Sequence, residues 1–421
     1  MVQANNVQAG GAAPGSGLLI VRVFLPFALG YFLSYLYRTV NAVIGPNLAK
    51  DLGIDAGGLG LLTSAYFIAF AAAQLPLGFF LDSHGPRRSE VVLLIAAAAG
   101  ALVFSLGEGL WGLVLGRAII GIGVAACLMA AFKAMAEWFP ADKLPMANGF
   151  IMASGGLGAI TATAPTQFLV AEVGWRYGFV ALAIATFVVA LILWTVVPER
   201  KRETGGDSVA DQIGSLRQIY RSIPFWRIAP ITAFSQGTFL AIQTLWAGPW
   251  LRDVAGLDPV TVSFTLLAGA VGFVIGNILV GVIAVRLIRR GVAPIVVVGV
   301  GVAVFMLAQL AVVGEWVAVP WALWFVFGMS GTIGVLSFSV LAQEFPANLT
   351  GRSSTGLNLM IFATAFALQW GMGEIISLWP TAADGGYAVP GYQMAFGIAL
   401  GLQAVALAWM VVARRFYPRT H

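Results

Sequence analysis

The stretch Gly78-Phe79-Phe80-Leu81-Asp82-Ser83-His84-Gly85-Pro86-Arg87-Arg88 joins two long apolar segments of the chain. One segment runs from Leu59 to Leu81 and the other from Glu90 to Leu106. A helix needs about 20 mainly apolar residues to cross a bilayer, and both segments are close to that length. Because charges and the turn residues Gly85 and Pro86 lie between them, we expect two membrane-spanning helices joined by a short polar turn.

The composition extends this expectation to the whole chain. Of its 421 residues, 59% are hydrophobic and 10% are charged, and its mean hydropathy is +0.90. Soluble domains carry about 25% charged residues, so this chain lacks the charges to cover a water-exposed surface. We therefore predict a multi-pass protein embedded in a lipid bilayer, in a plasma membrane such as the bacterial inner membrane.

A hydropathy window of roughly 19 residues divides the chain into about twelve candidate spans. The stretch between Ala147 and Val197 is the hardest to divide. The expected spans are Leu18–Leu48, Leu59–Leu81, Glu90–Leu106, Leu110–Trp138, Ala147–Val170, Trp175–Val197, Trp226–Trp250, Val260–Val285, Ala293–Val313, Val319–Leu341, Gly351–Ile376 and Gln393–Val412.

Polar segments between the spans define the expected organisation. Residues 1–17 form a tail without charged side chains, which lacks the basic start of a secretory signal, so the first span should be retained. Residues 198–225 are the widest polar stretch and are interpreted as a cytoplasmic linker between six-helix halves at 18–197 and 226–413. Residues 414–421 form a second cytoplasmic tail. The linker is either a solvated loop or a regulatory segment, and both interpretations stay open.

The distribution of basic residues predicts the orientation, because cytoplasmic loops of membrane proteins are enriched in Lys and Arg. With the N-terminus inside, the outer loops keep mainly Lys50, Arg176 and Arg252. We therefore expect both termini in the cytoplasm. The basic residues then inside are Arg87, Arg88, Lys143, the linker bases, Arg286, Arg289, Arg290, Arg352, Arg414, Arg415 and Arg419.

The sequence argues against several other classes of protein. Its net charge of +5 comes from short basic clusters, without the continuous stripe that would indicate nucleic-acid binding. His84 and His421 are its two histidines and Cys127 is its one cysteine, so neither a metal site nor a disulfide is expected. No phosphate-binding loop precedes a helix. We expect no cofactor, no metal and no enzymatic activity, and we expect a monomer.

A weak internal repeat relates the two halves. Glu137-Trp138-Phe139-Pro140-Ala141 is echoed by Glu344-Phe345-Pro346-Ala347, and Gly78–Arg88 is echoed loosely by Gly281–Arg290. Both echoes have nearly the same separation along the chain. Duplicated halves are typical of secondary carriers.

Three motifs resemble those of the major facilitator superfamily. Gly78–Arg88 is similar to its signature G-x-L-x-D-R-x-G-R/K-R between the second and third helices, with Ser83 in place of the first Arg. Arg117-Ala118-Ile119-Ile120-Gly121-Ile122-Gly123 is similar to its R-x-x-x-G-x-G pattern in the fourth helix. Gly155-Gly156-Leu157-Gly158, followed by Pro165, is similar to its fifth-helix pattern, without the usual Gly-Pro pair. With the spans, linker and repeat, the resemblance covers nearly the whole chain.

The resemblance implies an all-α membrane protein in which about twelve transmembrane helices form two pseudo-symmetric six-helix bundles around a cavity that opens to alternate sides. It also implies that Asp82 closes the inner gate, through a helix N-terminus or a basic residue. The alternative is that Asp82, Arg87 and Arg88 only determine topology. Val285 stands where the second half would carry its acidic residue, so the gate is expected to be asymmetric.

Arg38 is the candidate for substrate recognition. It lies within Tyr35-Leu36-Tyr37-Arg38-Thr39-Val40-Asn41, inside the first span and with no acidic residue within a helical turn. A charge at the centre of a span costs roughly 2.5–3.5 kcal/mol and needs a partner. No carboxylate is expected in the middle of any span. An anion from outside is then a suitable partner, because a guanidinium binds carboxylate or phosphate through two parallel hydrogen bonds.

Two tyrosines are expected to assist Arg38. Tyr35 and Tyr31 share its helix face, whereas Tyr37 should point elsewhere. The arrangement resembles the organic anion and organophosphate carriers of the superfamily, which place an arginine of the first helix in the cavity. The alternative is that Arg38 is satisfied by backbone carbonyls and extends outward.

Other charged residues have two interpretations each. Arg117 either joins the anion site, as it can in the anion carriers, or is a structural or coupling arginine. Lys133 precedes Glu137 by four residues, so the two are expected to pair near the cytoplasmic mouth, where we assign them to the gate. An anion site in the inner vestibule is the alternative for Lys133.

Polar uncharged residues within the spans complete the expected site. An amide that faces lipid is unsatisfied, so some of these side chains should line the cavity. Gln236 and Gln243 are seven residues apart on one helix face, and Trp246 follows three residues later. Asn41 and Asn358 are further candidates. The alternative is that these groups form hydrogen bonds between helices, away from substrate.

The sequence thus predicts a secondary active transporter that moves a small organic anion, either a carboxylate or a phosphate ester, by alternating access. The alternative is a proton-driven exporter of amphipathic compounds, suggested by 28 Phe, 13 Trp and 11 Met. Coupling to H+ or to a counter-anion stays open, because Asp82, Glu137 and Glu374 lie near the ends of spans. The catalytic cluster of an intramembrane enzyme and the seven-span plan of a receptor are not visible.

Overall fold

The computed structural model describes residues 16–199, 209–381 and 385–416. This part of the chain is helical and contains no strand. The N-terminal tail up to residue 15, the linker residues 200–208 and the last five residues lie outside the described residues.

The first half begins with one long bent helix and contains two helices that are divided by glycines. Gly85 in α4 and Gly174 in α8 both have a φ of 78°, which a glycine adopts without the steric cost that a side chain would add. The elements are α1 (Ser16–Leu19), η1 (Ile20–Phe24), α2 (Leu25–Thr39), α3 (Asn41–Leu52), α4 (Ala56–Leu106), α5 (Leu110–Gly123), α6 (Cys127–Trp138), η2 (Ala141–Lys143), α7 (Leu144–Thr161) and α8 (Ala164–Val196).

The second half follows a linker that is itself partly helical. Helix α9 (Val209–Tyr220) packs against α4 and α16, with Ile219 buried, so this part of the expected linker is more than a solvated loop. The remaining elements are α10 (Ile223–Ala241), η3 (Ile242–Trp246), α11 (Ala247–Asp253), α12 (Pro259–Arg289), α13 (Pro294–Val313), α14 (Pro320–Ser330), η4 (Gly331–Gly334), α15 (Val335–Ala342), α16 (Ala347–Ile376) and α17 (Val389–Phe416).

Local sequence explains where several helices begin. The side chain of Asp55 accepts a hydrogen bond from the Gly58 amide at 2.8 Å, which caps α4. Asp258 accepts hydrogen bonds from the amides of Val260 and Thr261 at 3.0 and 3.2 Å and caps α12 in the same way. These caps place the polar turns outside the apolar spans.

The fold class predicted from the sequence is confirmed: twelve spans form two six-helix bundles. Nine helices in the described ranges are long and apolar enough to cross a membrane. The turn at Gly85 makes two spans of α4, α7 forms another span with the start of α8, and α10 to α11 form the last. The fifth and sixth spans are hard to divide because a single residue of non-helical conformation, Gly174, separates their helices.

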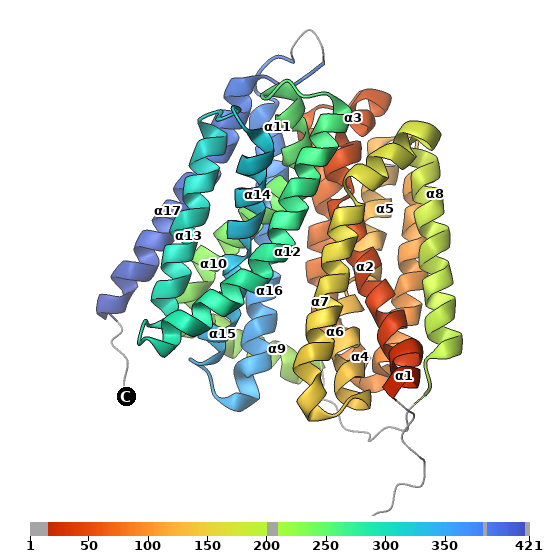
Figure 1. The fold of residues 1–421 in the computed structure, drawn as a ribbon, viewed down its shortest axis with the longest axis vertical. Coiled ribbons are helices and arrows are strands. Elements are labelled where there is room, and N and C mark those ends of the chain that lie inside the picture. The colour runs from red at the N-terminus through yellow and green to blue at the C-terminus, as the bar shows by residue number, and fades with distance from the viewer. Residues whose placement is uncertain (1–15, 200–208, 382–384, 417–421) are drawn as a thin grey trace, which may run out of the picture.

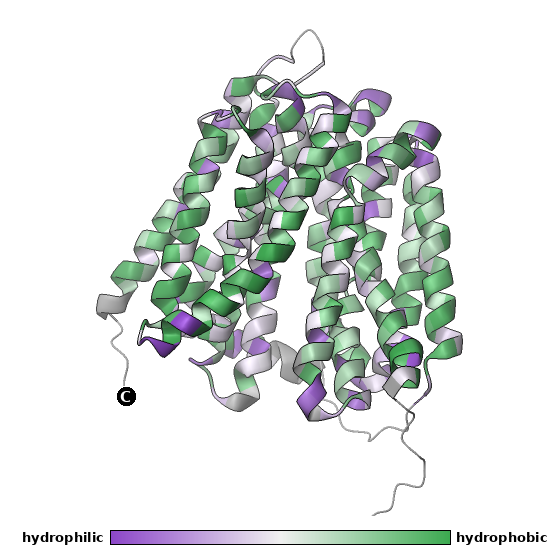
Figure 2. Cartoon of the chain, in the orientation of Figure 1, coloured by the Kyte–Doolittle hydropathy of each residue, from purple (hydrophilic) through white to green (hydrophobic). Residues whose placement is uncertain are grey.

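The two bundles stand side by side (Figure 1). The first and last described residues and α9 lie at the same end of the molecule, here called the linker end, and the opposite end is called the far end. Hydrophobic residues cover the middle of the helices, and hydrophilic residues gather at the two ends (Figure 2). Large apolar side chains such as Val405 (70% exposed) and Leu307 (66% exposed) point outward, as a lipid-facing surface requires.

The halves meet in backbone contact at the far end. A Cβ placed on Gly248 of α11 would lie 1.9 Å from the carbonyl oxygen of Ala42 in α3. A Cβ on Gly373 of α16 would lie 2.3 Å from the carbonyl oxygen of Ala56 in α4. Because real Cβ atoms do not approach this closely, only glycine permits these contacts, and they close the far end of the interface between the halves.

Candidate functional site

Arg38 lies between the two halves, near the end of α2. It is 8% exposed, and its guanidinium carbon lies 4.6 Å from the ring centre of Tyr35 and 5.3 Å from those of Phe70 and Phe362. Phe362 belongs to α16 of the second half, so both halves contribute rings. We call Arg38, Tyr35, Phe70 and Phe362 the Arg38 cluster.

No carboxylate in the described part of the chain forms an ion pair with Arg38, and its buried Nε has no hydrogen-bond partner. Cation–π contacts contribute about 0.5–2 kcal/mol each, less than the several kcal/mol that a buried unpaired charge costs. The rings position the guanidinium but leave its charge without an anion. A small anionic ligand would supply that missing charge.

The tyrosines lie as the helix periodicity predicts. The rings of Tyr31 and Tyr35 are 5.4 Å apart, and Tyr35 is also 5.7 Å from the ring of Phe273 in the second half. The Tyr37 hydroxyl instead makes a hydrogen bond of 2.9 Å with Thr186 of α8, on the other side of the helix. Tyr31 and Tyr35 therefore share the interface between the halves with Arg38.

Arg117 is enclosed within the first half. It is 1% exposed, and its Nη1 donates to the carbonyl oxygen of Tyr37 at 3.0 Å, one residue before Arg38. In this conformation Arg117 ties α5 to α2 and supports the backbone beneath Arg38. Its contact with substrate stays a prediction.

The uncharged candidates fall into two groups. Asn41, Gln236 and Trp246 donate to protein oxygens, namely Thr63 Oγ1 at 3.0 Å, the Gly331 carbonyl at 2.7 Å and the Gln369 carbonyl at 3.0 Å. These three connect helices in this conformation. Gln243 lines a narrow cavity of about 30 Å³ between the halves, and Asn358 is half-buried one turn before Phe362. Gln243 and Asn358 are therefore better placed to contact a ligand than the three residues that connect helices.

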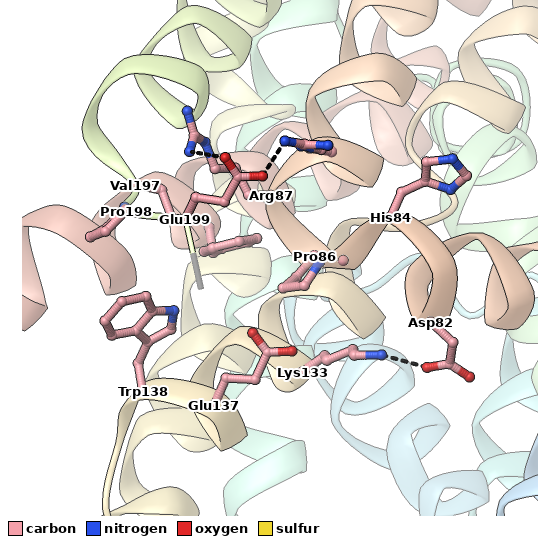
Figure 3. A pocket seen from close by; sticks show the side chains of 13 residues that line it. Asp82, His84, Pro86, Arg87, Lys133, Glu137, Trp138, Val197, Pro198 and Glu199 are labelled. Atoms are coloured by element: carbon pink, nitrogen blue, oxygen red, sulfur yellow. Dashed lines mark hydrogen bonds and ion pairs between the residues drawn. The ribbon is translucent and has the colours of Figure 1, made fainter. Parts of the chain in front are cut away.

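A second cavity, of about 810 Å³, lies at the linker end of the first half (Figure 3). Lys133 forms an ion pair with Asp82 across it and also donates to the Leu81 carbonyl at 3.2 Å. The expectation from helix spacing was a pair between Lys133 and Glu137, whereas the ion pair in the structure joins Lys133 to the neighbouring helix. The lining residues are Phe27, Asp82, His84, Gly85, Pro86, Arg87, Arg88, Lys133, Glu137, Trp138, Val197, Pro198 and Glu199.

Arg87 and Arg88 connect the α4 turn to the end of α8. Both form ion pairs with Glu199, and Arg87 also donates to the Trp194 carbonyl and lies 5.0 Å from that ring centre. Such half-exposed pairs contribute at most about 1 kcal/mol each. Together with the pair between Asp82 and Lys133, they hold the linker-end elements of the first half together.

Glu90 is a residue whose position sequence reasoning missed. It was expected at the mouth of the third span, but it is 0% exposed, and neither carboxylate oxygen has a hydrogen-bond partner in the described chain. Because α4 resumes directly after Gly85, Glu90 is already more than a turn inside the helix. Phe70 and Phe362 were missed for another reason, since two phenylalanines among 28 carry no distinguishing signal.

Comparison with known proteins places this fold in a family. The family model of the Major Facilitator Superfamily matches residues 27–373. The probable sulfoacetate transporter SauU of Cupriavidus necator is 25% identical over 268 residues, which are 60% of this chain and 62% of that protein. The hexuronate transporter of Escherichia coli strain K12 is 26% identical over 218 residues, 48% of this chain and 50% of that protein. The matches thus span between half and two thirds of these relatives.

Solved structures share the architecture. A bacterial homologue of the human lysosomal transporter Spinster, in an inward-facing and unoccupied conformation, has a TM-score of 0.76 to this chain at 17% identity. The match covers 93% of this chain and 96% of that chain. At this identity the likeness concerns the fold alone.

Proposed function

This chain belongs to the major facilitator superfamily and is not an enzyme; on that premise we propose that it is a secondary active transporter for a small organic anion. The cargo is a carboxylate or a phosphate ester that binds between the halves. Rocking of the two bundles exposes it to alternate sides of the membrane.

The observation that carries this proposal is the uncompensated charge of Arg38 at the interface between the halves. Its guanidinium is held by rings from both halves and has no acidic partner among the described residues. An anion there contacts both bundles, so its binding can stabilise their closure. The relatives support an anionic cargo, because sulfoacetate and hexuronates are organic anions.

The remaining residues have roles consistent with this cycle. Tyr31 and Tyr35 orient the anion, and Gln243 and Asn358 contribute polar groups from the second half. Arg117, Asn41, Gln236 and Trp246 reach substrate only when their present hydrogen bonds change. Asp82, Arg87, Arg88, Lys133 and Glu137 act at the inner gate.

The proposed setting follows the distribution of charges. The linker end faces the cytoplasm with both termini, the halves extend over 18–197 and 226–413, and the protein works as a monomer in the inner membrane. Transport is coupled to H+ or to a counter-anion.

Ligand binding to the purified protein tests the anion site. Sulfoacetate, glucuronate, glucarate and small phosphate esters should raise the unfolding temperature, because a ligand that binds the folded state stabilises it. The acids that bind should then exchange across proteoliposome membranes. Arg38→Gln should abolish both signals while the protein stays folded.

Arg22→Gln is the matched control, because Arg22 is exposed on the same bent helix, outside the Arg38 cluster. It should bind and exchange the acids as the wild type does. Normal affinity in Arg38→Gln would show that the site has been assigned wrongly.

An exporter of amphipathic compounds is the second candidate, favoured by the aromatic rings around Arg38. The charge of Arg38 repels lipophilic cations. Inhibition of exchange by mono- and dicarboxylates supports the anion carrier, whereas inhibition by lipophilic cations supports the exporter.

A further inference from the structure

Glu90 is a buried carboxyl group that the anion site does not use. It is 0% exposed in α4, five residues beyond the turn at Gly85, and both of its carboxylate oxygens lack a hydrogen-bond partner in the described chain. A carboxylate that is buried without a partner is strongly unfavourable and takes up a proton instead. In this conformation Glu90 is therefore neutral.

The neighbours of Glu90 provide room but no charge. From α2, Gly30 faces it so closely that a Cβ there would lie 2.0 Å from Glu90 Oε1. From α6, the thiol of Cys127 is the titratable group beside the carboxyl, and a thiol is only a weak donor. Among the residues that the structure describes, no charged side chain acts electrostatically on Glu90. The site suits a protonated acid.

The linker-end cavity comes close to this carboxyl group. It is lined by Phe27, three residues before Gly30, and by Pro86, four residues before Glu90. Along their helices, Phe27 and Pro86 therefore lie about one turn, roughly 5–6 Å, from Gly30 and Glu90. Because charged residues line the cavity, water can fill it and exchange a proton with Glu90.

Helix α2 connects the surroundings of Glu90 with Arg38. Gly30, Ser34 and Arg38 are four residues apart on α2, which places Arg38 about 12 Å along the helix from Gly30. Ser34 donates to the Val124 carbonyl at 3.4 Å, and Cys127 lies within electrostatic reach of both Glu90 and Arg38. A proton at Glu90 and an anion at Arg38 would thus both be bound by residues of the first half.

We propose that Glu90 is a proton-binding site that takes up and releases one proton in each transport cycle, so that the anion bound at Arg38 moves together with a proton. The carboxylate takes the proton from water on one side of the membrane and returns it to water on the other. With the proton on Glu90 and the anion at Arg38, neither charge is left uncompensated while the halves move. The coupling rests on the proposed anion transport; the proton site itself does not.

Transport driven by a pH gradient tests the coupling. A gradient of one pH unit drives about tenfold accumulation of a substrate that moves with one proton. In proteoliposomes, with glucuronate or the acid that binds the wild type best, Glu90→Gln should lose this accumulation and its pH dependence. Because Gln imitates the protonated acid, exchange between equal concentrations should continue. Gradient-driven accumulation equal to the wild type would overturn the proposal.

Two further variants make the result specific. Glu108→Gln changes an exposed carboxylate at the far-end turn between α4 and α5 and should leave accumulation unchanged. Glu90→Asp keeps a carboxyl group and should retain gradient-driven uptake, which tests the site even if Glu90→Gln folds poorly. Loss of gradient coupling in Glu108→Gln as well would count against Glu90 as the site.

Infrared spectroscopy detects the proton without any substrate. The wild type at neutral pH should show the carbonyl absorption of a protonated carboxylic acid that Glu90→Gln lacks and Glu108→Gln retains. If this band is present but no acid is transported, the anion proposal fails and the proton site stands. If acids are transported and the band persists in Glu90→Gln, the proton site fails and the anion proposal stands.

Discussion

At the scale of single residues, the cost of a charge in a nonpolar interior decides what the side chains do. Arg38 keeps its charge because aromatic faces attract a cation, and because a guanidinium does not lose its proton in proteins. Glu90 has neither a cation nor a donor of comparable strength beside it, and for this reason we propose that it takes up a proton. The two residues respond differently to the same surroundings because of their chemistry.

Phe362 is the contribution of the second half to the Arg38 cluster, and its removal should weaken anion binding. Phe362→Ala removes one cation–π contact and leaves the guanidinium less well positioned, so we expect about a three- to tenfold rise in Kd. Isothermal titration with the acid that binds the wild type measures it. Phe366→Ala, one turn along α16 and in ring contact with Trp370, should leave Kd unchanged. Equal effects of both variants would count against a role for the cluster.

At the scale of elements, glycines decide how closely helices approach across the interface between the halves. Gly373 of α16 and Gly60 of α4 contact backbone atoms of the opposite half, with Cβ positions 2.3 Å from Ala56 O and 2.9 Å from Gln369 O. Backbone atoms cannot move aside as a flexible side chain can. The far-end contact between α4 and α16 therefore depends on the absence of a single methyl group at each position.

Gly373→Ala should force the far end apart. The added methyl group is expected to cost about 1–3 kcal/mol in the conformation described here, which shifts the population toward states open at the far end. Spin labels on α3 and α11 would report longer distances in pulsed electron resonance.

Gly371→Ala provides the control on the same helix, because a Cβ at Gly371 meets nothing within 4 Å. Its distance distribution should match the wild type, and its stability should stay the same or rise slightly. Unchanged distances in Gly373→Ala would contradict closure through this contact.

At the scale of the whole molecule, lipid on the outside and two packed halves on the inside separate the tasks of the surface and the core. The exposed faces carry large apolar residues, while ion pairs gather at the linker end of the first half. Arg38 lies apart from both regions, between the halves, and this interface is where we propose that it binds a ligand.

Reporter fusions test the orientation of the molecule. A fluorescent protein after Phe416 should fluoresce, because this end is expected in the cytoplasm, whereas alkaline phosphatase fused at Glu108, in the far-end turn, should be active outside. The same reporters exchanged between the two positions provide the control. The reverse pattern of activities would show that the basic residues have been assigned to the wrong side.

Most of the helix boundaries could be predicted from the sequence, because crossing a bilayer imposes a length and a polarity that each segment carries by itself. The span Leu110–Trp138 was placed at the bounds that α5 and α6 together occupy. The division within Ala147–Val197 is harder, since Gly174, flanked by Glu172 and Arg176, turns the chain between two helices without a longer loop.

The sequence alone determined the class of the protein and its spans and made Arg38 a candidate for substrate binding, because hydropathy and an isolated charge are properties of one segment. Only the tertiary structure decided that Phe70 and Phe362 meet at Arg38, that Lys133 pairs with Asp82, and that Glu90 is buried against Gly30. These contacts join residues far apart in the chain. They follow from how helices pack against one another, and the sequence of one segment does not specify which other segments it packs against.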